Sequence, residues 1–158
     1  MARLSDLPDF EREHLLKMCE QVSPLSPAAW VDGPPLSKRR VAIISTAGLH
    51  ARDDAAFAPG EGAAGYRVIP SDVEPAALTM SHISVNFDRS GFRRDPEVVF
   101  PLQGLRALAN EGVVGSVADF HYAFMGATFP PSRFESKARD IAGLLRHDRV
   151  DAAILLPV

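Results

Sequence analysis

Cysteine is almost absent from this chain, because Cys19 is the only one among its 158 residues. A single cysteine cannot form an internal disulfide or a cysteine-rich zinc cluster, so the sequence excludes both as sources of stability. Cys19 falls on the apolar stripe of a predicted helix, where cysteine usually behaves as a small hydrophobic residue. We therefore expect it to be buried and structural rather than a nucleophile.

Long apolar runs and an excess of positive charge are missing as well. No stretch approaches the roughly 20 apolar residues that span a bilayer, so no membrane role is predicted. Residues 1–9 lack the apolar core of a signal peptide, which favours a cytoplasmic protein. The formal net charge is -3 at pH 7, which offers no basic field for nucleic acid. A composition of 46% hydrophobic and 23% charged residues is typical of a globular domain.

Segments with helical spacing alternate along the chain with short apolar runs. Helices are predicted at residues 8–21, 101–110 and 131–147. Two continuous apolar runs predict buried, neighbouring parallel strands at residues 41–44 and 150–156. Weaker strand signals occur at residues 66–69, 83–87 and 113–117, and residues 45–65 and 89–95 are predicted as loops.

This alternation predicts an α/β fold, a layered sandwich with a largely parallel central sheet. Residues 1–40 are predicted to form an N-terminal helix and a proline-rich linker. Residues 41–158 are predicted to form the α/β domain itself.

Candidate site residues follow or flank the predicted strands, because open α/β sheets bind ligands beyond the carboxyl ends of their strands. A turn of small residues follows the first buried strand, and histidines lie near the weaker strand candidates. The residues predicted to line a crevice are Ser45, Thr46, His50, His82, His121 and Tyr122. A surface turn with unrelated loop histidines is the alternative interpretation.

Two other patterns in the sequence are weaker. His50, His82 and His121, with Asp88 as an orienting carboxylate, suggest a metal or proton-transfer group, but their separations match no local metal motif and no metal is predicted. Residues 60–65 match G-x-G-x-x-G, yet no strand leads directly into them and no helix follows, so a mobile loop is preferred over a dinucleotide site.

Several segments in the same order resemble the selenoprotein B-type subunit of the glycine, sarcosine, betaine and D-proline reductase family. The most specific segment is His-Tyr-Ala-Phe-Met-Gly at residues 121–126. The others are residues 41–50, 66–70, 81–82, 99–102 with Leu105, 111–112 and 150–156. The resemblance extends over residues 41–158 and covers residues 1–40 poorly.

The resemblance implies an oxidoreductase that reductively cleaves a C–N bond of a glycine-, betaine-, sarcosine- or proline-like substrate. In such enzymes a selenocysteine or cysteine attacks the carbon beside the amine, and a thiol/disulfide couple supplies the electrons. A carbonyl group, often a pyruvoyl group on a partner subunit, activates the amine, and no cofactor is expected in this chain. The implied partners are the small amino-acid-like substrate, a partner reductase subunit and a thiol reductant, while a homo-oligomer stays open.

The resemblance also implies where the nucleophile lies. In the family it follows the strand that matches residues 150–156, so we expect it just after Val158. A selenocysteine codon is also a stop codon, and on this expectation the domain is incomplete at its C-terminus. A genuine end, leaving a non-catalytic binding or assembly domain, is the alternative.

Overall fold

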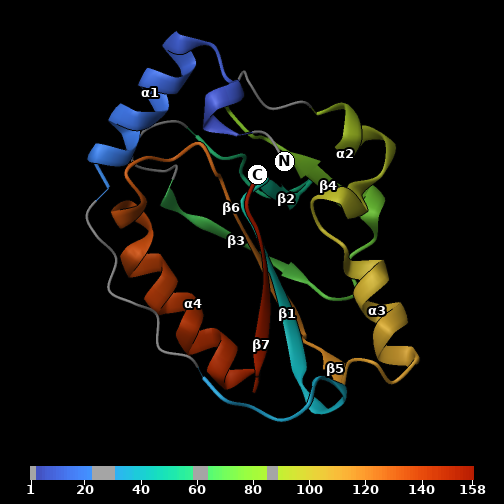
Figure 1. Cartoon of the computed structure of the whole chain (residues 1–158). Helices are drawn as coiled ribbons and strands as arrows, with labels where there is room; N and C mark the ends of the chain where they lie inside the picture. The colour runs from blue at the N-terminus through green and yellow to red at the C-terminus, as the bar shows by residue number, and fades with distance from the viewer. Residues whose placement is uncertain (1–2, 23–30, 59–63, 85–88) are drawn as a thin grey trace.

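The computed structural model describes residues 3–22, 31–58, 64–84 and 89–158. A mostly parallel sheet lies between α4 (Glu135–His147) on one face and α3 (Leu102–Asn110) on the other (Figure 1). The predicted α/β fold is therefore confirmed, and both of these helices were predicted from their apolar spacing. Gly112 follows α3 with φ +73, a conformation that suits a glycine at the end of a helix.

Strand β1 (Arg40–Ser45) is the centre of the sheet. On one side it pairs in parallel with β7 (Ala152–Leu156) over its whole length. On its other side it pairs in parallel with β5 (Ser116–Val117) and then β6 (Phe120–Phe124). Strand β3 (Tyr66–Pro70) completes the sheet by pairing antiparallel to β6.

A two-stranded ribbon lies beyond the carboxyl end of β1. It consists of β2 (Leu49–Ala51) and β4 (Leu78–Met80), which pair antiparallel. The prediction of a loop throughout residues 45–65 is wrong here, because strands of three residues are too short to show a periodic pattern. Gly48 makes the turn into β2 with φ +68, a backbone conformation that suits glycine.

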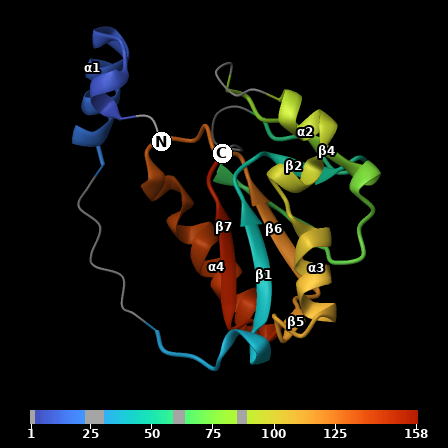
Figure 2. The ribbon, with the colours of Figure 1, turned by 45° about the vertical axis from the view of Figure 1, so that its right-hand side comes forward.

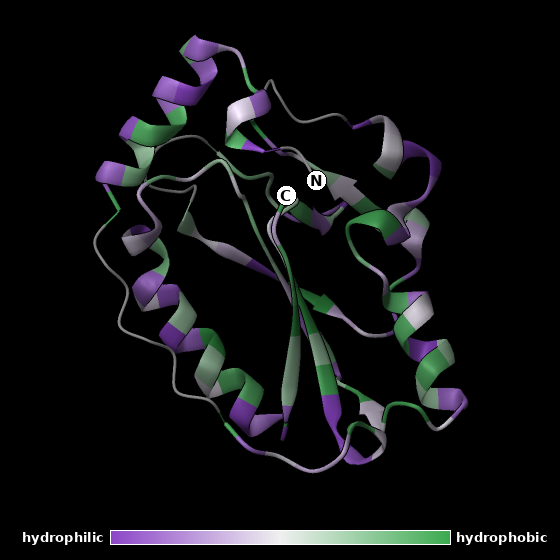
Figure 3. Cartoon of the chain, viewed as in Figure 1, coloured by the Kyte–Doolittle hydropathy of each residue, from purple (hydrophilic) through white to green (hydrophobic). Residues whose placement is uncertain are grey.

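The sheet has two apolar faces that follow the alternation of its strands. Val41 and Ile43 pack on the face covered by α3, together with Leu102 and Leu105. Ile44 packs on the opposite face, where the cluster beneath α4 contains Tyr122, Phe124 and Ile141. In Figure 3 the amino-terminal end of β1 is hydrophilic and the rest of the strand is hydrophobic.

Helix α1 (Asp9–Glu20) was predicted correctly, but its environment was not. It has no buried residue, and Cys19 is exposed rather than buried. Figure 2 shows α1 standing apart from the sheet, and its apolar residues Phe10, Leu15 and Leu16 are exposed. The division of the chain near residue 40 stays a prediction.

Strand β7 is an edge strand, which corrects the prediction that it is deeply buried. Leu155 is 68% exposed and Ile154 is 36% exposed. The strand has the continuous apolar sequence of a central strand, yet among the described residues no strand pairs with its outer side.

The remaining elements are short. Residues 89–95 were predicted to be a loop, whereas α2 (Ser90–Arg94) forms there. Ile83 and Ser84 are not in a strand, and residues 85–87 of that predicted strand, like residues 60–63, lie outside the described residues. Within the described residues, 3-10 turns lie at Leu4–Asp6, Leu36–Lys38, Pro75–Ala77, Pro96–Val98 and Pro131–Phe134. No helix in the described part of the chain is both long and apolar enough to cross a membrane.

Candidate functional site

The carboxyl ends of β1 and β7 meet the segment that follows β6, and main-chain hydrogen bonds join all three. The N–H of Thr46 donates to the carbonyl oxygen of Leu156 at 3.0 Å. The N–H of Gly126 donates to the carbonyl oxygen of Thr46 at 2.7 Å. This edge of the sheet is where the sequence places the candidate site.

The Thr46 side chain holds the main chain at Val158. Its Oγ1 accepts a hydrogen bond from the N–H of Val158 at 2.8 Å and lies 3.3 Å from the carbonyl oxygen of the same residue. Gly126 allows this close approach, since a Cβ there would lie 2.5 Å from the Val158 carbonyl oxygen and 2.9 Å from Thr46 Oγ1. A larger residue at position 126 would force these segments apart.

Ser45 is fully buried directly before this contact. Its Oγ accepts a hydrogen bond from the N–H of Ala47 at 3.2 Å, so the side chain stabilises the turn that leaves β1. Ser45 therefore has a structural role at the carboxyl edge of the sheet.

His82 lies beside the same Val158 main chain. The N–H of Ser84 donates to its Nδ1 at 3.2 Å, which requires that nitrogen to be unprotonated and leaves the proton of the neutral ring on Nε2. Burial lowers the pKa of His82, as does the positive charge of Arg89, while a hydrogen bond with the main chain of Val158 opposes them. The Arg89 guanidinium also donates to the carbonyl oxygen of His82. His82 and Thr46 thus meet at Val158.

His50 lies in β2, on the ribbon next to this edge. Its Nδ1 is 2.7 Å from the carbonyl oxygen of Ala51, and because a carbonyl can only accept, Nδ1 carries a proton. The ring is buried and packs edge-on against Phe57 with the centroids 6.5 Å apart. Phe57 in turn packs on Met125, next to Gly126. His50 is therefore close to the edge but on the side of the ribbon that faces Phe57.

His121 lies within β6 rather than after a strand as predicted. The register of β1 slips by two residues between β5 and β6, from Val41 opposite Val117 to Ile44 opposite Tyr122. The N–H of Ile43 falls in this irregular stretch and donates to His121 Nδ1 at 3.0 Å. The imidazole thus supplies the acceptor that a regular strand would provide.

The environment of His121 is that of a core residue. Its ring is fully buried and meets Phe100 in a T-shaped contact with the centroids 5.7 Å apart. Burial is the largest cause that lowers its pKa to about 4, and the charges of Arg106 and Arg40 act in the same direction against Asp148. His121 is therefore a neutral histidine between the sheet and α3.

Tyr122 points to the opposite face and is also a core residue. It packs beneath α4, with the ring of Tyr66 6.0 Å away, and burial raises its pKa. Of the six predicted residues, the structure brings Thr46 and His82 together, with Ser45 adjacent and His50 on the neighbouring ribbon. It places His121 and Tyr122 inside the two apolar layers. The sequence analysis did not predict this because it did not recognise their strand.

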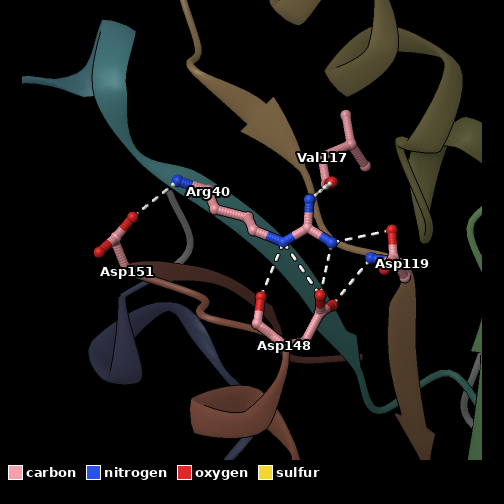
Figure 4. Close-up of polar contacts among 5 residues, drawn as sticks. All are labelled: Arg40, Val117, Asp119, Asp148 and Asp151. Carbon is pink, nitrogen blue, oxygen red and sulfur yellow. Dashed lines mark hydrogen bonds and ion pairs between the residues drawn. The ribbon is translucent and has the colours of Figure 1, made fainter.

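The opposite end of β1 carries an ionic cluster that the sequence analysis did not predict (Figure 4). The Arg40 guanidinium binds the Asp148 carboxylate and lies 2.8 Å from Asp119 Oδ1, and its Nη1 donates to the carbonyl oxygen of Val117 at 2.7 Å. The Arg40 N–H also donates to Asp151 at 2.9 Å. A signal was present, since a basic residue directly precedes a buried apolar strand.

Charge dominates the properties of this cluster. Burial alone would raise the pKa of Asp148, but hydrogen bonds from Arg40 and from the N–H of Asp119 outweigh it and lower that pKa. The pKa of Arg40 is raised although burial opposes the rise, because Asp148 and Asp119 both stabilise its charge. The charged donors of Arg40 all face acceptors, so the cluster stabilises this end of the sheet and has no free group to bind a ligand.

The hypothesis of a histidine-based metal group finds no support in the geometry. Within the described residues, no three His, Cys, Asp or Glu side chains come together as ligands. Asp88, the proposed orienting carboxylate, lies outside those residues.

Comparison with known proteins gives a consistent result. The model of the family described as glycine/sarcosine/betaine reductase selenoprotein B matches residues 1–157, and so includes the N-terminal part that the sequence resemblance covered poorly. D-proline reductase subunit gamma of Acetoanaerobium sticklandii is 31% identical over 121 residues, which are 76% of this chain and 49% of that protein. No solved structure shows significant similarity.

Two further relatives come from other reductase complexes. Sarcosine reductase complex component B subunit beta of Peptoclostridium acidaminophilum is 27% identical over 92% of this chain and 33% of its own length. Glycine reductase complex component B subunit gamma of Symbiobacterium thermophilum is 28% identical over 76% of this chain and 28% of its own length. The chain therefore spans about half or less of each curated relative that it matches.

Proposed function

The chain belongs to the glycine/sarcosine/betaine reductase selenoprotein B family, and on that premise we propose that it builds one side of the active site of an amino-acid reductase subunit. The proposed reaction is the reductive cleavage of the C–N bond in a glycine-, sarcosine-, betaine- or D-proline-like substrate. The relatives are subunits of reductases that act on these compounds by name, and they support the substrate class without selecting one member.

This proposal rests on the contacts that the carboxyl edge of the sheet makes with Val158. Thr46 binds its main chain, His82 lies beside it, and Gly126 lets the segments approach closely. A selenocysteine or cysteine placed just after Val158 would stand at the carboxyl edge of β7, next to β1. If a helix begins there, its N-terminus would favour the ionised selenolate or thiolate.

The proposed chemistry transfers two electrons from a dithiol to the substrate. The selenolate or thiolate attacks the carbon beside the nitrogen, and the C–N electron pair leaves with the nitrogen, which takes up a proton. One thiolate of the reductant then attacks the selenium or sulfur of the adduct, and the released carbon takes up a proton. The second thiolate closes a disulfide and sets the nucleophile free.

A carbonyl group on a partner subunit, such as a pyruvoyl group, would supply the activation of the amine. In this proposal it belongs to the partner, and no residue of this chain is assigned to hold it. The part of this chain is to orient the nucleophile through the packed ends of β1, β6 and β7.

The test is turnover by the complete gene product assembled with its partner subunits. Release of the amine, or opening of the proline ring, is measured with glycine, sarcosine, betaine and D-proline, each with and without a dithiol. We expect dithiol-dependent turnover of one of the four and its loss after alkylation with iodoacetamide, with the label mapping to the residue after Val158. An assembled complex that turns over none of them would reject the proposed function.

A binding or assembly role is the second candidate, and one observation favours it. A groove of about 380 Å³ between α4 and β7 is lined almost entirely by apolar side chains. Its lining residues are Ile44, Thr46, Phe124, Phe134, Ala138, Leu155, Leu156 and Pro157. Stable co-elution with the partner subunit in size-exclusion chromatography, without turnover, would favour this role over catalysis.

A further inference from the structure

The three buried histidines of the domain do not carry the proton on the same ring nitrogen. In His82 and His121 a main-chain N–H donates to Nδ1, so the neutral ring carries its proton on Nε2. His50 has the opposite arrangement, because its Nδ1 faces the carbonyl oxygen of Ala51 at 2.7 Å and must donate to it. Neutral His50 therefore presents an unprotonated Nε2 with a free lone pair.

This lone pair lacks a partner in the described structure. His50 is only 4% exposed, and its Nε2 accepts no hydrogen bond from the described residues. A buried acceptor without a donor destabilises a fold, and such groups are rare in native proteins. The hydrogen bond to Ala51 fixes the proton on Nδ1, so a change of tautomer cannot satisfy the unpaired Nε2. A ligand that brings a donor would.

The position of His50 connects this nitrogen to the sheet edge. Strand β2 begins at the residue after Gly48, whose N–H donates to the carbonyl oxygen of Phe124 at the end of β6 at 2.8 Å. On its side-chain face, His50 packs on Phe57, which contacts Met125. The imidazole is thus one side-chain layer from the carboxyl end of β6, in apolar surroundings that exclude water.

We propose that His50 is the proton acceptor of the carboxyl-edge site, a role that rests on the proposed reductase function. Its Nε2 takes the proton of an X–H donor brought by a reactant, either the S–H of the thiol reductant or an N–H of the substrate amine. The X–H bond breaks and an N–H bond forms on Nε2, while sulfur or nitrogen keeps the electron pair. The imidazolium then returns the proton to the carbon that is released when the selenium or sulfur adduct is cleaved.

The tautomer is tested first and independently of activity. Two-bond ¹⁵N–¹H correlation spectra of the gene product labelled with ¹⁵N-histidine report which ring nitrogen is protonated. We expect His50 to be protonated on Nδ1 and both His82 and His121 on Nε2, with assignments from single His→Gln variants. A neutral His50 protonated on Nε2 would overturn the inference, whatever the activity of the protein.

The role is tested in the assembled complex. General-base catalysis contributes typically 10²–10⁴-fold, so His50→Gln should lower turnover by at least about 100-fold. His14→Gln, at an exposed position in α1, is the matched control and should leave turnover unchanged. In His50→Ala, added imidazole should restore turnover, whereas thiophene, a ring of similar size without a basic nitrogen, should not. Unchanged turnover in His50→Gln, or no rescue by imidazole in a folded His50→Ala variant, would overturn the role.

The same variants identify the donor. A loss in kcat/KM for the dithiol alone indicates the S–H proton, and a loss for the amine substrate alone indicates the N–H proton. Failure of the wild-type complex to turn over any substrate would reject the proposed function and the proton-acceptor role together. Wild-type turnover that His50→Gln leaves intact would reject the role of His50 and keep the function.

Discussion

The two ends of β1 are held in different ways. At the amino end the Arg40 guanidinium is surrounded by Asp148, Asp119 and the carbonyl oxygen of Val117. At the carboxyl end the contacts are neutral, and the Thr46 hydroxyl and main-chain groups hold Val158. The same strand thus begins in an ionic cluster and ends at a set of hydrogen bonds between uncharged groups.

This difference separates stability from chemistry. The ionic cluster is closed, because its main donors already face acceptors and its carboxylate is held ionised. The carboxyl end is built from small residues, among them Ser45 and Gly126, and the neighbouring ribbon retains a histidine nitrogen without a donor. We therefore expect changes at the amino end to act through the folded fraction, and changes at the carboxyl end to act on the site as well.

Mild acid is expected to have the largest effect, and it acts between the two ends at His121. Since burial lowers its pKa from 6.5 to about 4, the unfolded chain binds a proton more readily than the fold does. Its contribution is complete above pH 6.5 and is lost as the pH falls toward 4. At about 1.4 kcal/mol per pH unit this corresponds to about 3 kcal/mol. Urea unfolding at pH 7 and at pH 4.5 measures most of it.

The variant His121→Asn isolates this contribution. Asparagine can still accept the hydrogen bond from the Ile43 N–H but does not titrate in this range. We expect it to be less stable at pH 7 and to lose most of the dependence between pH 7 and 4.5. His82, whose pKa is also lowered, would account for the remainder. An unchanged pH dependence in His121→Asn would show that another group is responsible.

Removal of Arg40 ranks next and tests the closed ionic cluster. The Asp148 side chain is 12% exposed, so Arg40→Met leaves a largely buried carboxylate without its counter-ion. Breaking such a pair destabilises a protein by up to 3–5 kcal/mol, and partial exposure reduces this to about 2–3 kcal/mol. Because the pKa of Asp148 is lowered, this contribution exists above its usual value of 3.8 and disappears only below it. Acid therefore affects His121 first and the cluster afterwards.

Arg139→Met provides the matched control for Arg40. Arg139 also forms an ion pair, with Glu135 at 2.7 Å, but the two side chains are 77% and 65% exposed. Exposed ion pairs at i,i+4 in a helix contribute about 0.3–0.5 kcal/mol, so the free energy of unfolding should change by no more than about 0.5 kcal/mol. Equal losses in the two variants would contradict the view that the amino end is a special fastening.

The elements that could be predicted from the sequence are those with a long repeating signal. The stripe of α4 and the continuous run of β1 extend over enough residues for one periodicity to stand out. The ribbon of β2 and β4, with three residues in each strand, was missed for lack of length. Strand β6 was missed because buried polar His121 interrupts its apolar pattern, and the reason for that histidine, the irregular register opposite Ile43, exists only in three dimensions.

The candidate site was predictable to the same partial extent. The rule that ligands bind beyond strand ends identified Thr46 correctly as an edge residue. It could not place His121 and Tyr122, because their strand was missing from the prediction. Burial of β7 was predicted from its composition, yet composition cannot reveal whether another strand lies beside it. The hydrogen bond between Thr46 and Val158 joins residues 112 positions apart, so no local pattern in the sequence predicts it.

Glycine substitutions sharpen the comparison at the carboxyl end, with a smaller expected effect. In Gly126→Ala the added methyl group would lie 2.5 Å from the Val158 carbonyl oxygen and 2.9 Å from that of Thr46, both main-chain atoms that cannot move alone. Such overpacking destabilises by about 1–3 kcal/mol, and we expect about 1–2 kcal/mol in urea unfolding.

Gly143→Ala is the control with the opposite sign. Gly143 lies within α4, and a Cβ there meets no atom within 4 Å. Alanine favours the helix over glycine, so this variant should be more stable by about 0.5–1 kcal/mol. If both alanine variants were stabilised, the close approach at Gly126 would be wrong.

The smallest expected effect concerns Thr46 and decides whether the carboxyl end is held as described. Thr46→Val keeps the shape of the side chain but removes the acceptor for the Val158 N–H, at the cost of about 1 kcal/mol. The loss is local, so amide hydrogen exchange at Val158 should accelerate about fivefold while the exchange of Ile43 in the core changes little. Thr46→Ser retains the hydroxyl and should restore slow exchange. Unchanged exchange in Thr46→Val would mean that the end of β7 is fixed by other contacts, and the proposed orientation of a nucleophile after Val158 would lose its structural basis.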